Sequence, residues 1–307
     1  MPKVSVITVN FNHSQITEEL LTSITATNTY KNIEVIVVDN ASTINPVPRW
    51  TNKYTDIKFI RSDINLGFAG GNNLGIANAT GDYYFLVNND TEFTAGLVEK
   101  LVNILDGNPQ VGVISPLIKY YNNKSLIQYA GFTLVNYYTC RNTAIGKGQK
   151  DNGQYENFVG QTGYCHGAAM MVKRQAVEKA GLMAENFFLY FEEIDWGERI
   201  NRAGYQAWVC GSAIIFHKES ISVGKNSPVK EYFMNRNRIL FIRRNAPFFK
   251  ALIFYIYFLL VVVPRNIVSY IKTKRFNFIP LLLRAIGWNI THSKTSTDLG
   301  YTLNKTS

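Results

Sequence analysis

The chain has 307 residues, 46% of them hydrophobic, so it is long enough to bury a large core. Its three cysteines show neither paired nor metal-ligand spacing, which argues against a disulfide-stapled secreted domain and fits a reducing compartment. The net charge of +10 comes from the C-terminal quarter. From Lys225 onward there are 14 Lys and Arg residues and 2 Asp and Glu residues, whereas the first 224 residues contain 18 Lys and Arg and 20 Asp and Glu. Such a basic end suits an anionic membrane or nucleic acid.

Through residue 116, short β-branched runs alternate with stretches of helical periodicity. The runs predict buried strands at 4–9, 33–40, 57–62, 83–87 and 111–115. Apolar residues at helical spacing predict helices at 14–24, 70–81 and 94–107, the first capped by Ser14 and the last stopped by Gly107. Because the chain opens directly on a strand, we expect no export signal. The alternation predicts an α/β fold with a mostly parallel sheet flanked by helices.

The pattern changes after Pro116. Residues 117–160 are rich in Tyr, Asn, Gly and Thr, which indicates hairpins or long loops. Regular structure returns up to residue 217, with an apolar run at 167–172, a helix at 174–181 and a strand at 207–217.

An apolar stretch lies in the basic end of the chain. It covers 248–263, about 16 residues bounded by prolines and interrupted by Lys250, whereas a membrane-spanning helix needs roughly 20. We therefore expect an interfacial or packed helix here, and a second one at 276–290.

Polar side chains follow four of the predicted strands. They are Thr8 and Asn10, then Asp39, then the stretch from Asn65 to Asn73, then Asn88, Asn89 and Asp90. Each cluster alone is typical of a turn or a helix cap. Parallel strands bring their carboxyl ends to one edge of a sheet, so we expect the four clusters to converge there. A carboxylate such as Asp39 accepts hydrogen bonds from a ribose diol or a base N–H, which predicts a nucleotide site.

The third cluster, GFAGGNN, is rich in glycine. Gly70 and Gly71 would let the backbone approach a ligand closely, and the N-terminus of the following helix would favour an anion. A flexible turn explains the same glycines equally well, because their spacing is not that of the dinucleotide-binding fingerprint.

The segment FEEIDWGERI concentrates carboxylates beside bulky aromatic residues. Its acidic residues are Glu192, Glu193, Asp195 and Glu198. A solvated helix face with ion pairs to Arg199 and Arg202 is the plainer interpretation. The flanking aromatic residues, with Trp196 inside the segment, instead favour a partly desolvated carboxylate whose raised pKa suits a general base.

Two further groups have the chemistry to bind metal or phosphate. Asp90 and His217, each at a strand end, form a sparse protein site for Mg²⁺ or Mn²⁺, with phosphate oxygens and water as the other ligands. Arg236 and Arg238 interrupt an aromatic and apolar segment, and arginine is suited to bidentate phosphate contacts.

These clusters, in this order, resemble glycosyltransferase family 2, the inverting enzymes of GT-A fold, and in particular the rhamnosyltransferase-like branch that builds bacterial surface polysaccharides. The matching strings run from residue 4 to about 240 and are VITVNFN, VVDNAS, NLGFAGGNNLGI, YYFLVNNDT, GAAMMVKRQAVEKAG, FFLYFEEIDWGERINRAGY, FHKES and NRNRI. The resemblance implies a GT-A domain at 1–240, with a nucleotide-sugar-binding half at 1–116 and an acceptor and catalytic half at 117–240. The basic, membrane-associating extension would be 241–307.

The resemblance also implies roles for the singled-out residues. Donor binding falls to Thr8, Asn10, Asp39, Asn65, Gly70, Gly71, Asn72, Asn88, Asn89, Arg236 and Arg238. Asp90 and His217 would hold the divalent cation, Mg²⁺ or Mn²⁺. Glu193 is the preferred base, Asp195 the second choice and Glu192 their neighbour, while Trp196 would lie on the acceptor side.

The implied reaction moves rhamnose or another hexose from a dTDP-, UDP- or GDP-linked donor to a saccharide or lipid-linked acceptor, with inversion. The enzyme would then sit in the cytoplasm, on the inner face of the cell membrane, held by its C-terminal segment.

Two alternatives belong to other functional classes. The family's metal motif has a carboxylate where this chain has Asn88, which favours a catalytically impaired protein that binds nucleotide sugars or polysaccharide. A nucleic-acid binder using the basic end is disfavoured, because such proteins interleave charge with isolated aromatic residues rather than long apolar runs.

Overall fold

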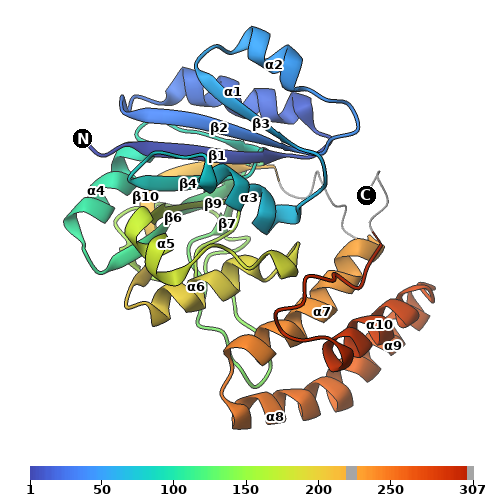
Figure 1. Ribbon diagram of the computed structural model, residues 1–307. Coiled ribbons are helices and arrows are strands. Elements are labelled where there is room, and N and C mark those ends of the chain that lie inside the picture. Colours follow the sequence, from blue (N-terminus) through green and yellow to red (C-terminus); the bar gives the residue numbers. More distant parts are fainter. Residues whose placement is uncertain (219–226, 303–307) are drawn as a thin grey trace.

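A mixed β-sheet with helices on both faces forms the larger part of the computed structural model, which describes residues 1–218 and 227–302 (Figure 1). Along the sheet the strands are β3 (Ile57–Ser62), β2 (Ile33–Asn40), β1 (Val4–Asn10), β4 (Tyr83–Val87), β9 (Ala169–Lys173), β6 (Val111–Tyr120), β10 (Gln206–His217) and β5 (Thr91–Glu92). Two short strands lie off this path: β7 (Ile127–Tyr129) pairs with β6, and β8 (Val159–Gln161) pairs with β10.

The sheet is parallel in its first half and mixed in its second. β3, β2, β1 and β4 run parallel, as the alternating pattern predicts. β9 lies antiparallel between β4 and β6, because the chain enters it at the carboxyl end of β4, where Val87 pairs with Ala169. This entry point brings the segment before β9 to the edge where the polar clusters lie.

Six helices cover the two faces of the sheet (Figure 1). They are α1 (Ser14–Thr27), α2 (Val47–Lys53), α3 (Gly67–Ala77), α4 (Leu97–Gly107), α5 (Arg174–Ala180) and α6 (Glu192–Arg202). α4 ends at the predicted Gly107, and its Leu97, Leu101 and Leu105 are all buried. The predicted cap of α1 is wrong: Ser14 is the first helical residue and His13 holds the cap position, without a capping side-chain hydrogen bond.

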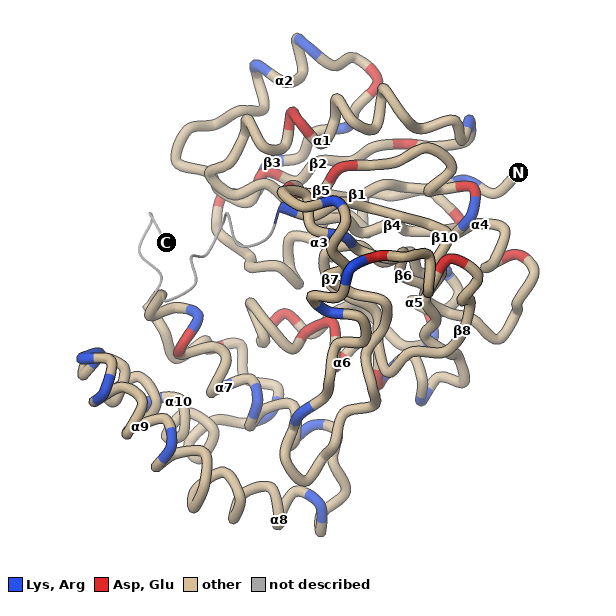
Figure 2. Tube along the Cα trace, turned by 180° about the vertical axis from the view of Figure 1, so that it is seen from behind, with Lys and Arg blue, Asp and Glu red and all other residues tan. Residues whose placement is uncertain are grey.

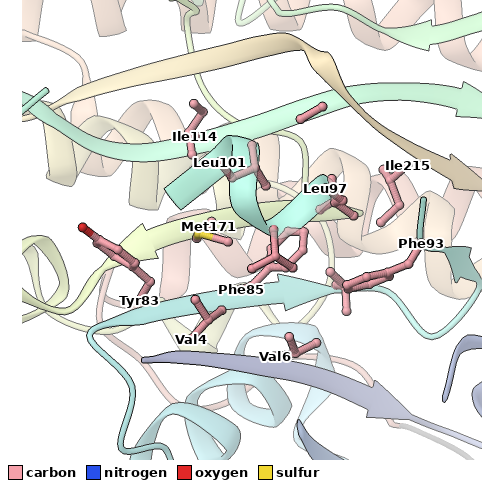
Figure 3. Packing of buried hydrophobic residues seen from close by; sticks show 14 of the residues in the cluster. Val4, Val6, Tyr83, Phe85, Phe93, Leu97, Leu101, Ile114, Met171 and Ile215 are labelled. Carbon is pink, nitrogen blue, oxygen red and sulfur yellow. The ribbon is translucent and has the colours of Figure 1, made fainter. Parts of the chain in front are cut away.

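The main core lies between the sheet and the helices α1 and α4. Figure 3 shows Phe85 and Phe93 packed beneath Leu97 and Leu101, with Val6 of the central strand beside them. The Phe85 and Phe93 ring centroids are 5.6 Å apart. Burying these aromatic and aliphatic side chains fixes the strands, and so fixes the positions of the polar residues at their ends.

The last four helices form a separate layer that contacts α6 of the sheet domain and the loops around residues 135–140 and 186–191 (Figure 1). They are α7 (Pro228–Asn245), α8 (Phe248–Tyr257), α9 (Val263–Lys272) and α10 (Phe278–Thr291), with a π-helical turn, Phe258–Val262, joining α8 to α9. In this C-terminal part, residues 227–302, the only acidic residues are Glu231 and Asp298, whereas Lys and Arg are spread along the helices (Figure 2). The predicted boundary at residue 240 falls inside α7, so the helical layer begins at Pro228.

The apolar stretch does not end at Pro264. The π-helical turn precedes that proline and accommodates its missing N–H, so helix continues from Phe248 to Lys272, 25 residues in all. By length and composition it is one helix able to cross a membrane, and 22% of its most apolar window is buried.

Candidate active site

Asn10 and Asp39 meet at the carboxyl ends of β1 and β2, as the strand pattern predicts. Asn10 Nδ2 donates to Asp39 Oδ1 at 2.8 Å and to Ser42 Oγ at 3.0 Å. Asp39 also pairs with Arg61, its register partner at the end of β3. Both Asn10 and Asp39 are fully buried, so the carboxylate already has internal partners. Sequence reasoning missed Arg61, although the β2–β3 register would have placed it there.

Thr8 precedes this pair on β1. Its side chain is buried, and its hydroxyl has no hydrogen-bond partner among the described residues. A buried hydroxyl without a partner is costly, and Thr8 Oγ1 is one of two buried side-chain oxygens without a hydrogen-bond partner at this edge in the described structure, the other being Asp90 Oδ1.

The glycine-rich cluster is fixed by its own side chains rather than open to a ligand. Asn65 Oδ1 accepts from Gly67 N at 2.9 Å and from Asn40 Nδ2 at 3.0 Å. Asn72 Nδ2 donates to the Phe68 carbonyl one turn earlier, at 2.9 Å. The Asn65 and Asn72 amides therefore hold the entry and first turn of α3.

The glycines serve close packing of α3. A Cβ on Gly71 would lie 2.8 Å from Val9 Cγ1 of β1, and one on Gly70 would lie 2.7 Å from Leu66 Cβ. The expectation that Gly70 and Gly71 open the backbone toward a ligand is wrong, because what approaches closely is a strand and the helix's own first turn.

The NND segment places its three side chains differently. Asn88 is half-buried, and its carbonyl accepts from Thr91 Oγ1 at 2.8 Å. Asn89 is buried and donates to Thr17 Oγ1 of α1 at 3.0 Å. Asp90 is buried, and its Oδ1 lies 3.2 Å from His217 Nε2. The structure thus brings together the two residues predicted as metal ligands.

A third residue fixes the orientation of this histidine. His217 Nδ1 faces Gln128 Oε1 at 2.9 Å, and an amide oxygen only accepts, so Nδ1 carries a proton. In the neutral ring the Nε2 lone pair therefore points toward Asp90 Oδ1. Metal-binding histidines characteristically donate their other N–H to such an oxygen, so the pair fits a divalent cation. In residues 1–218 and 227–302 no group of three or more His, Cys, Asp and Glu could hold a metal, so further ligands would come from substrate or water.

His166 lies beside this pair and was not predicted. Its ring is 6.1 Å from that of His217 and stacks on Phe132 at 5.7 Å. Burial lowers the pKa of His166 to about 3, so the ring is neutral. Its Nδ1 accepts from Ala168 N at 3.0 Å, which leaves Nε2 as the N–H donor.

Glu193 follows a strained loop at the start of α6. Phe188, Tyr190 and Phe191 all have positive φ, between 65° and 75°. Asn237 of α7 holds this loop: its Nδ2 lies 2.8 Å from three carbonyl oxygens, those of Phe187, Leu189 and Tyr190. Non-glycine residues in this region persist only where the surroundings over-determine them, as at functional sites.

The Glu193 carboxyl group is poised for proton transfer. Burial raises its pKa to about 7, and its Oε2 is inaccessible to solvent with no hydrogen-bond partner in the described structure. Glu193 lines a cavity of about 400 Å³ with Tyr164, Tyr190 and Arg238. Its carboxyl carbon also lies near Gly167, the neighbour of His166. Glu192 is buried beside it, and burial together with the Glu193 charge raises the Glu192 pKa further. The Glu193 carboxyl group is thus desolvated, and its raised pKa lies in the range that suits a general base.

The model of glycosyl transferase family 2 matches residues 5–181, more than half of the chain. The chain belongs to glycosyl transferase family 2. This glycosyltransferase is 22% identical over 241 residues to N-acetylglucosaminyl-diphospho-decaprenol L-rhamnosyltransferase of Mycobacterium tuberculosis, which covers 72% of this chain and 78% of that protein. It is 26% identical over 257 residues to the low-salt glycan biosynthesis hexosyltransferase Agl10 of Haloferax volcanii, covering 81% of this chain and 78% of that protein.

Solved structures share its GT-A fold. The mannosyltransferase PcManGT of Pyrobaculum calidifontis, in complex with GDP-Man and Mn²⁺, superposes with a TM-score of 0.57 at 18% identity, covering 95% of this chain and 76% of that one. TarS of S. aureus in complex with UDP-GlcNAc superposes with a TM-score of 0.59 at 17% identity, covering 94% of this chain and 80% of that one.

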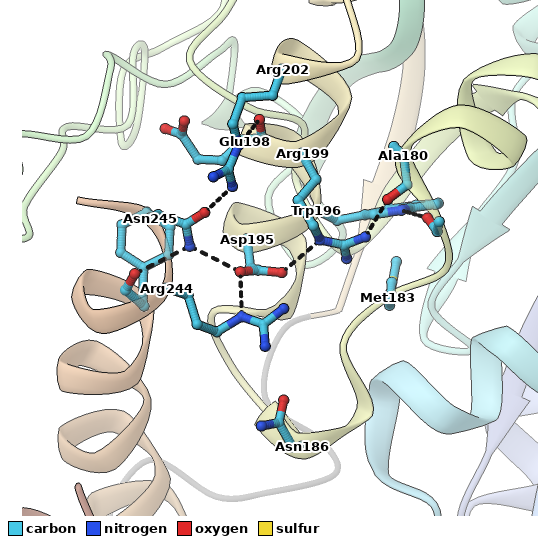
Figure 4. Close-up of polar contacts among 12 residues, drawn as sticks. Ala180, Met183, Asn186, Asp195, Trp196, Glu198, Arg199, Arg202, Arg244 and Asn245 are labelled. Carbon is cyan, nitrogen blue, oxygen red and sulfur yellow. Dashed lines mark hydrogen bonds and ion pairs between the residues drawn. The ribbon is translucent and has the colours of Figure 1, made fainter. Parts of the chain in front are cut away.

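Asp195 of this glycosyltransferase is a structural anion, not a second base. Figure 4 shows it held by Arg199, Arg244 and Asn245, with Nε of each arginine and the amide Nδ2 of Asn245 all 2.9 Å from its oxygens. Burial alone would raise its pKa, but the charges of Arg244 and Arg199 outweigh burial and lower it. A carboxylate with three donors keeps too low a pKa to accept a proton from a hydroxyl.

Two further predictions for the family 2 site are corrected. Trp196 is buried in the core, and its indole donates to the Gly181 carbonyl at 2.8 Å. It is therefore not available to contact an acceptor substrate. Arg236 is also fully buried; it donates to the Leu299 carbonyl at 2.7 Å and stacks between Phe233 and Trp288. Both side chains pack helices against their neighbours. Their burial cannot be deduced from the sequence motif in which they occur.

Proposed function

We propose that this protein transfers rhamnose or another hexose from a nucleoside-diphosphate sugar to a hydroxyl group of a lipid-linked saccharide, with inversion at the anomeric carbon. Family membership and the two named relatives, a rhamnosyltransferase acting in a decaprenol-linked pathway and a glycan-building hexosyltransferase, support the reaction class. Family membership and these two relatives together favour a cell-surface glycan as the product.

One observation carries the proposal: a desolvated carboxyl group, Glu193, lines the cavity that the acceptor would enter. With a pKa of about 7, it takes the proton of the attacking hydroxyl near neutral pH. The new C–O bond forms at the anomeric carbon, on the side opposite the bond to the diphosphate. That bond breaks, and the nucleoside diphosphate leaves with its electron pair. A single displacement inverts the sugar, and among the described residues that line the cavity Glu193 is the one carboxylate, so none of them is a second carboxylate for a covalent intermediate.

The donor end of the site is the edge formed by β1, β2 and β4. Thr8, with its unpartnered hydroxyl, and the half-buried Asn88 have capacity to bond a donor, whereas Asp39 would contact the nucleotide only by exchanging a present partner. Asp90 and His217 would hold a divalent cation, Mg²⁺ or Mn²⁺. When bound, that cation neutralises charge on the departing diphosphate. With one carboxylate in the motif, its affinity should depend on the donor's phosphates.

The helix Phe248–Lys272 supports placement at a membrane surface. One stripe, Ala251, Phe254, Phe258 and Val262, is buried against the helical layer. The opposite side exposes apolar side chains, including Phe249 at 76% and Leu260 at 73%. A helix that packs on its own protein along one side and is apolar on the other is suited to lie in the interface, on the cytoplasmic leaflet in this proposal.

The test is transfer by the full chain from UDP-, dTDP- and GDP-hexoses to a synthetic prenyl-diphosphate-linked N-acetylglucosamine, with Mg²⁺, Mn²⁺ or EDTA. We expect one donor to react, only with metal, and to give the inverted product by NMR. Glu193→Gln should bind that donor but not transfer it. Full turnover by this variant, or a product of retained configuration, would contradict the proposal. Donor binding without transfer by any pair would favour the catalytically impaired alternative.

A further inference from the structure

The cavity that contains Glu193 also contains three arginines with no matching negative charge. Its lining includes Arg141 from the loop before β8, Arg238 from α7 and Arg265 from α9, and Glu193 is its one carboxylate. Within residues 1–218 and 227–302, none of these three arginines forms an ion pair with Asp or Glu, although other arginines and lysines in the same range do.

Arg238 lies close enough to Arg141 and Arg265 for their positive charges to act on it. Burial lowers the pKa of the Arg238 guanidinium, and the charges of Arg141 and Arg265 lower it further. Arg238 donates to the Thr139 carbonyl, but its Nε is inaccessible to solvent and has no acceptor among the described residues. A protein gains nothing in stability from such an arrangement by itself, so an anion is the natural occupant.

The same arginines border the apolar helix. The Arg141 guanidinium carbon is 5.9 Å from the Tyr257 ring centroid, and that of Arg238 is 6.0 Å and 5.9 Å from the rings of Phe254 and Phe258. Beyond these rings the helix exposes a run of apolar side chains, which includes Ile256, Leu259, Leu260 and Val261. The cavity thus holds Glu193 together with three arginines, and two of these arginines, Arg141 and Arg238, reach the rings of the apolar helix.

We propose that Arg141, Arg238 and Arg265 bind the diphosphate of a prenyl-diphosphate-linked acceptor, with the prenyl chain on the exposed face of the α8–α9 helix and the saccharide at Glu193. This site rests on the proposed function and adds the residues that select the acceptor. The diphosphate diester carries two negative charges, and three guanidinium groups can hold its oxygens through paired N–H donors.

The nucleotide sugar also contains a diphosphate, but the lining places the cavity with the acceptor. No residue of the Asn10, Asp39, Asp90 and His217 edge lines it; its walls come from the 135–142 loop, Tyr164, the start of α6, and helices α7 and α9. A donor diphosphate bound in this cavity would lie on the side of Glu193 that faces the helical layer, away from the residues proposed to bind the donor.

Binding of farnesyl diphosphate to the full-length protein in detergent tests this site without requiring catalysis. We expect Arg238→Ala and Arg265→Ala each to weaken binding about tenfold or more, as loss of a charged hydrogen-bond donor implies. Arg284→Ala removes an exposed arginine from α10, outside the cavity, and should bind as wild type does. Farnesol should bind much more weakly than farnesyl diphosphate. Arg265 is exposed, so its variant should fold even if Arg238→Ala does not.

A second arm identifies the source of the diphosphate. The wild-type protein and the same variants are titrated with UDP, dTDP and GDP. We expect the nucleotide that binds wild type most tightly to bind every variant with the same affinity. If nucleotide affinity falls together with farnesyl diphosphate affinity, the arginines serve the donor and the inference is wrong. It is equally wrong if both variants bind farnesyl diphosphate like wild type, or if farnesol binds as tightly. Failure of the proposed reaction would appear in the transfer assay instead, since these titrations involve no turnover.

Discussion

Replacing Glu193 with glutamine separates the charge of this side chain from its shape. Burial raises the pKa of the carboxyl group from 4.5 to about 7. Since each pKa unit corresponds to about 1.36 kcal/mol, the charged form costs the folded protein about 3 kcal/mol. Glutamine has nearly the same shape and never ionises, so the variant avoids this cost at every pH.

The sign of the effect follows from linkage between protonation and folding. The folded pKa lies above the unfolded value, so wild-type stability is full below about pH 4.5 and falls as pH rises through about 7. We expect Glu193→Gln to match wild type near pH 4.5 and to exceed it by up to about 3 kcal/mol at pH 8. Glu192 is present in both proteins, but the Glu193 charge contributes to its raised pKa, so the substitution also relieves Glu192 at high pH, which acts in the same direction.

Urea denaturation at pH 5 and pH 8 measures this difference directly. Glu178→Gln, an exposed site on the neighbouring α5, is the matched control and should show no such pH dependence. The same Glu193 variant should lose about 10²- to 10⁴-fold in transfer rate, the usual contribution of a general base. A stability difference that stays constant with pH would refute the desolvation argument, and near-normal transfer would refute the assignment as base.

Three further changes probe other parts of the molecule. Asp195→Asn leaves the half-buried Arg199 and Arg244 without their anion, so the free energy of unfolding at pH 7 should fall by about 1.5–3 kcal/mol in urea titrations; because the wild-type pKa is lowered, this deficit should shrink as pH falls below about 4. Asp90→Asn should abolish the extra thermal stabilisation that Mn²⁺ adds to nucleotide-sugar binding, without abolishing binding of the nucleotide alone. The double substitution Phe249→Glu and Leu260→Glu should release the protein from anionic liposomes in flotation assays. Ile44→Glu should not, although the Ile44 side chain is 83% exposed, because it lies in the sheet domain and outside the apolar helix.

The sequence predicts the positions of the strands better than their directions. β2, β3 and β4 occupy the predicted residues, because uninterrupted β-branched runs are a strong local signal. The reversal at β9 carries no such signal, since a buried strand has the same composition in either direction. It follows instead from the route of the chain through residues 121–168, which local periodicity does not describe.

Candidate site residues divide in a similar way. The convergence of Asn10, Asp39 and Asp90 at one edge follows from strand topology and is correct. Whether a polar residue faces a ligand or the protein depends on partners that are distant in the chain. Arg236 shows this: its stacking partner Trp288 lies on α10, and nothing in the NRNRI string indicates that contact. The same string contains Asn237, which holds the loop before Glu193, and an amide between two arginines carries no local signal of that role.

The position of the base depends on the helices that face the membrane in our proposal. Asn237 of α7 holds the loop before Glu193 through three carbonyl groups, and Phe241 packs on Phe191 of the same loop at 6.1 Å. α7 in turn packs along α10, from which Trp288 covers Arg236. Deleting the chain after residue 245 would therefore unpack α7 and move the base, as well as removing the membrane-binding surface. Substitution of exposed apolar residues changes only the second property, and is for that reason the cleaner test of membrane binding.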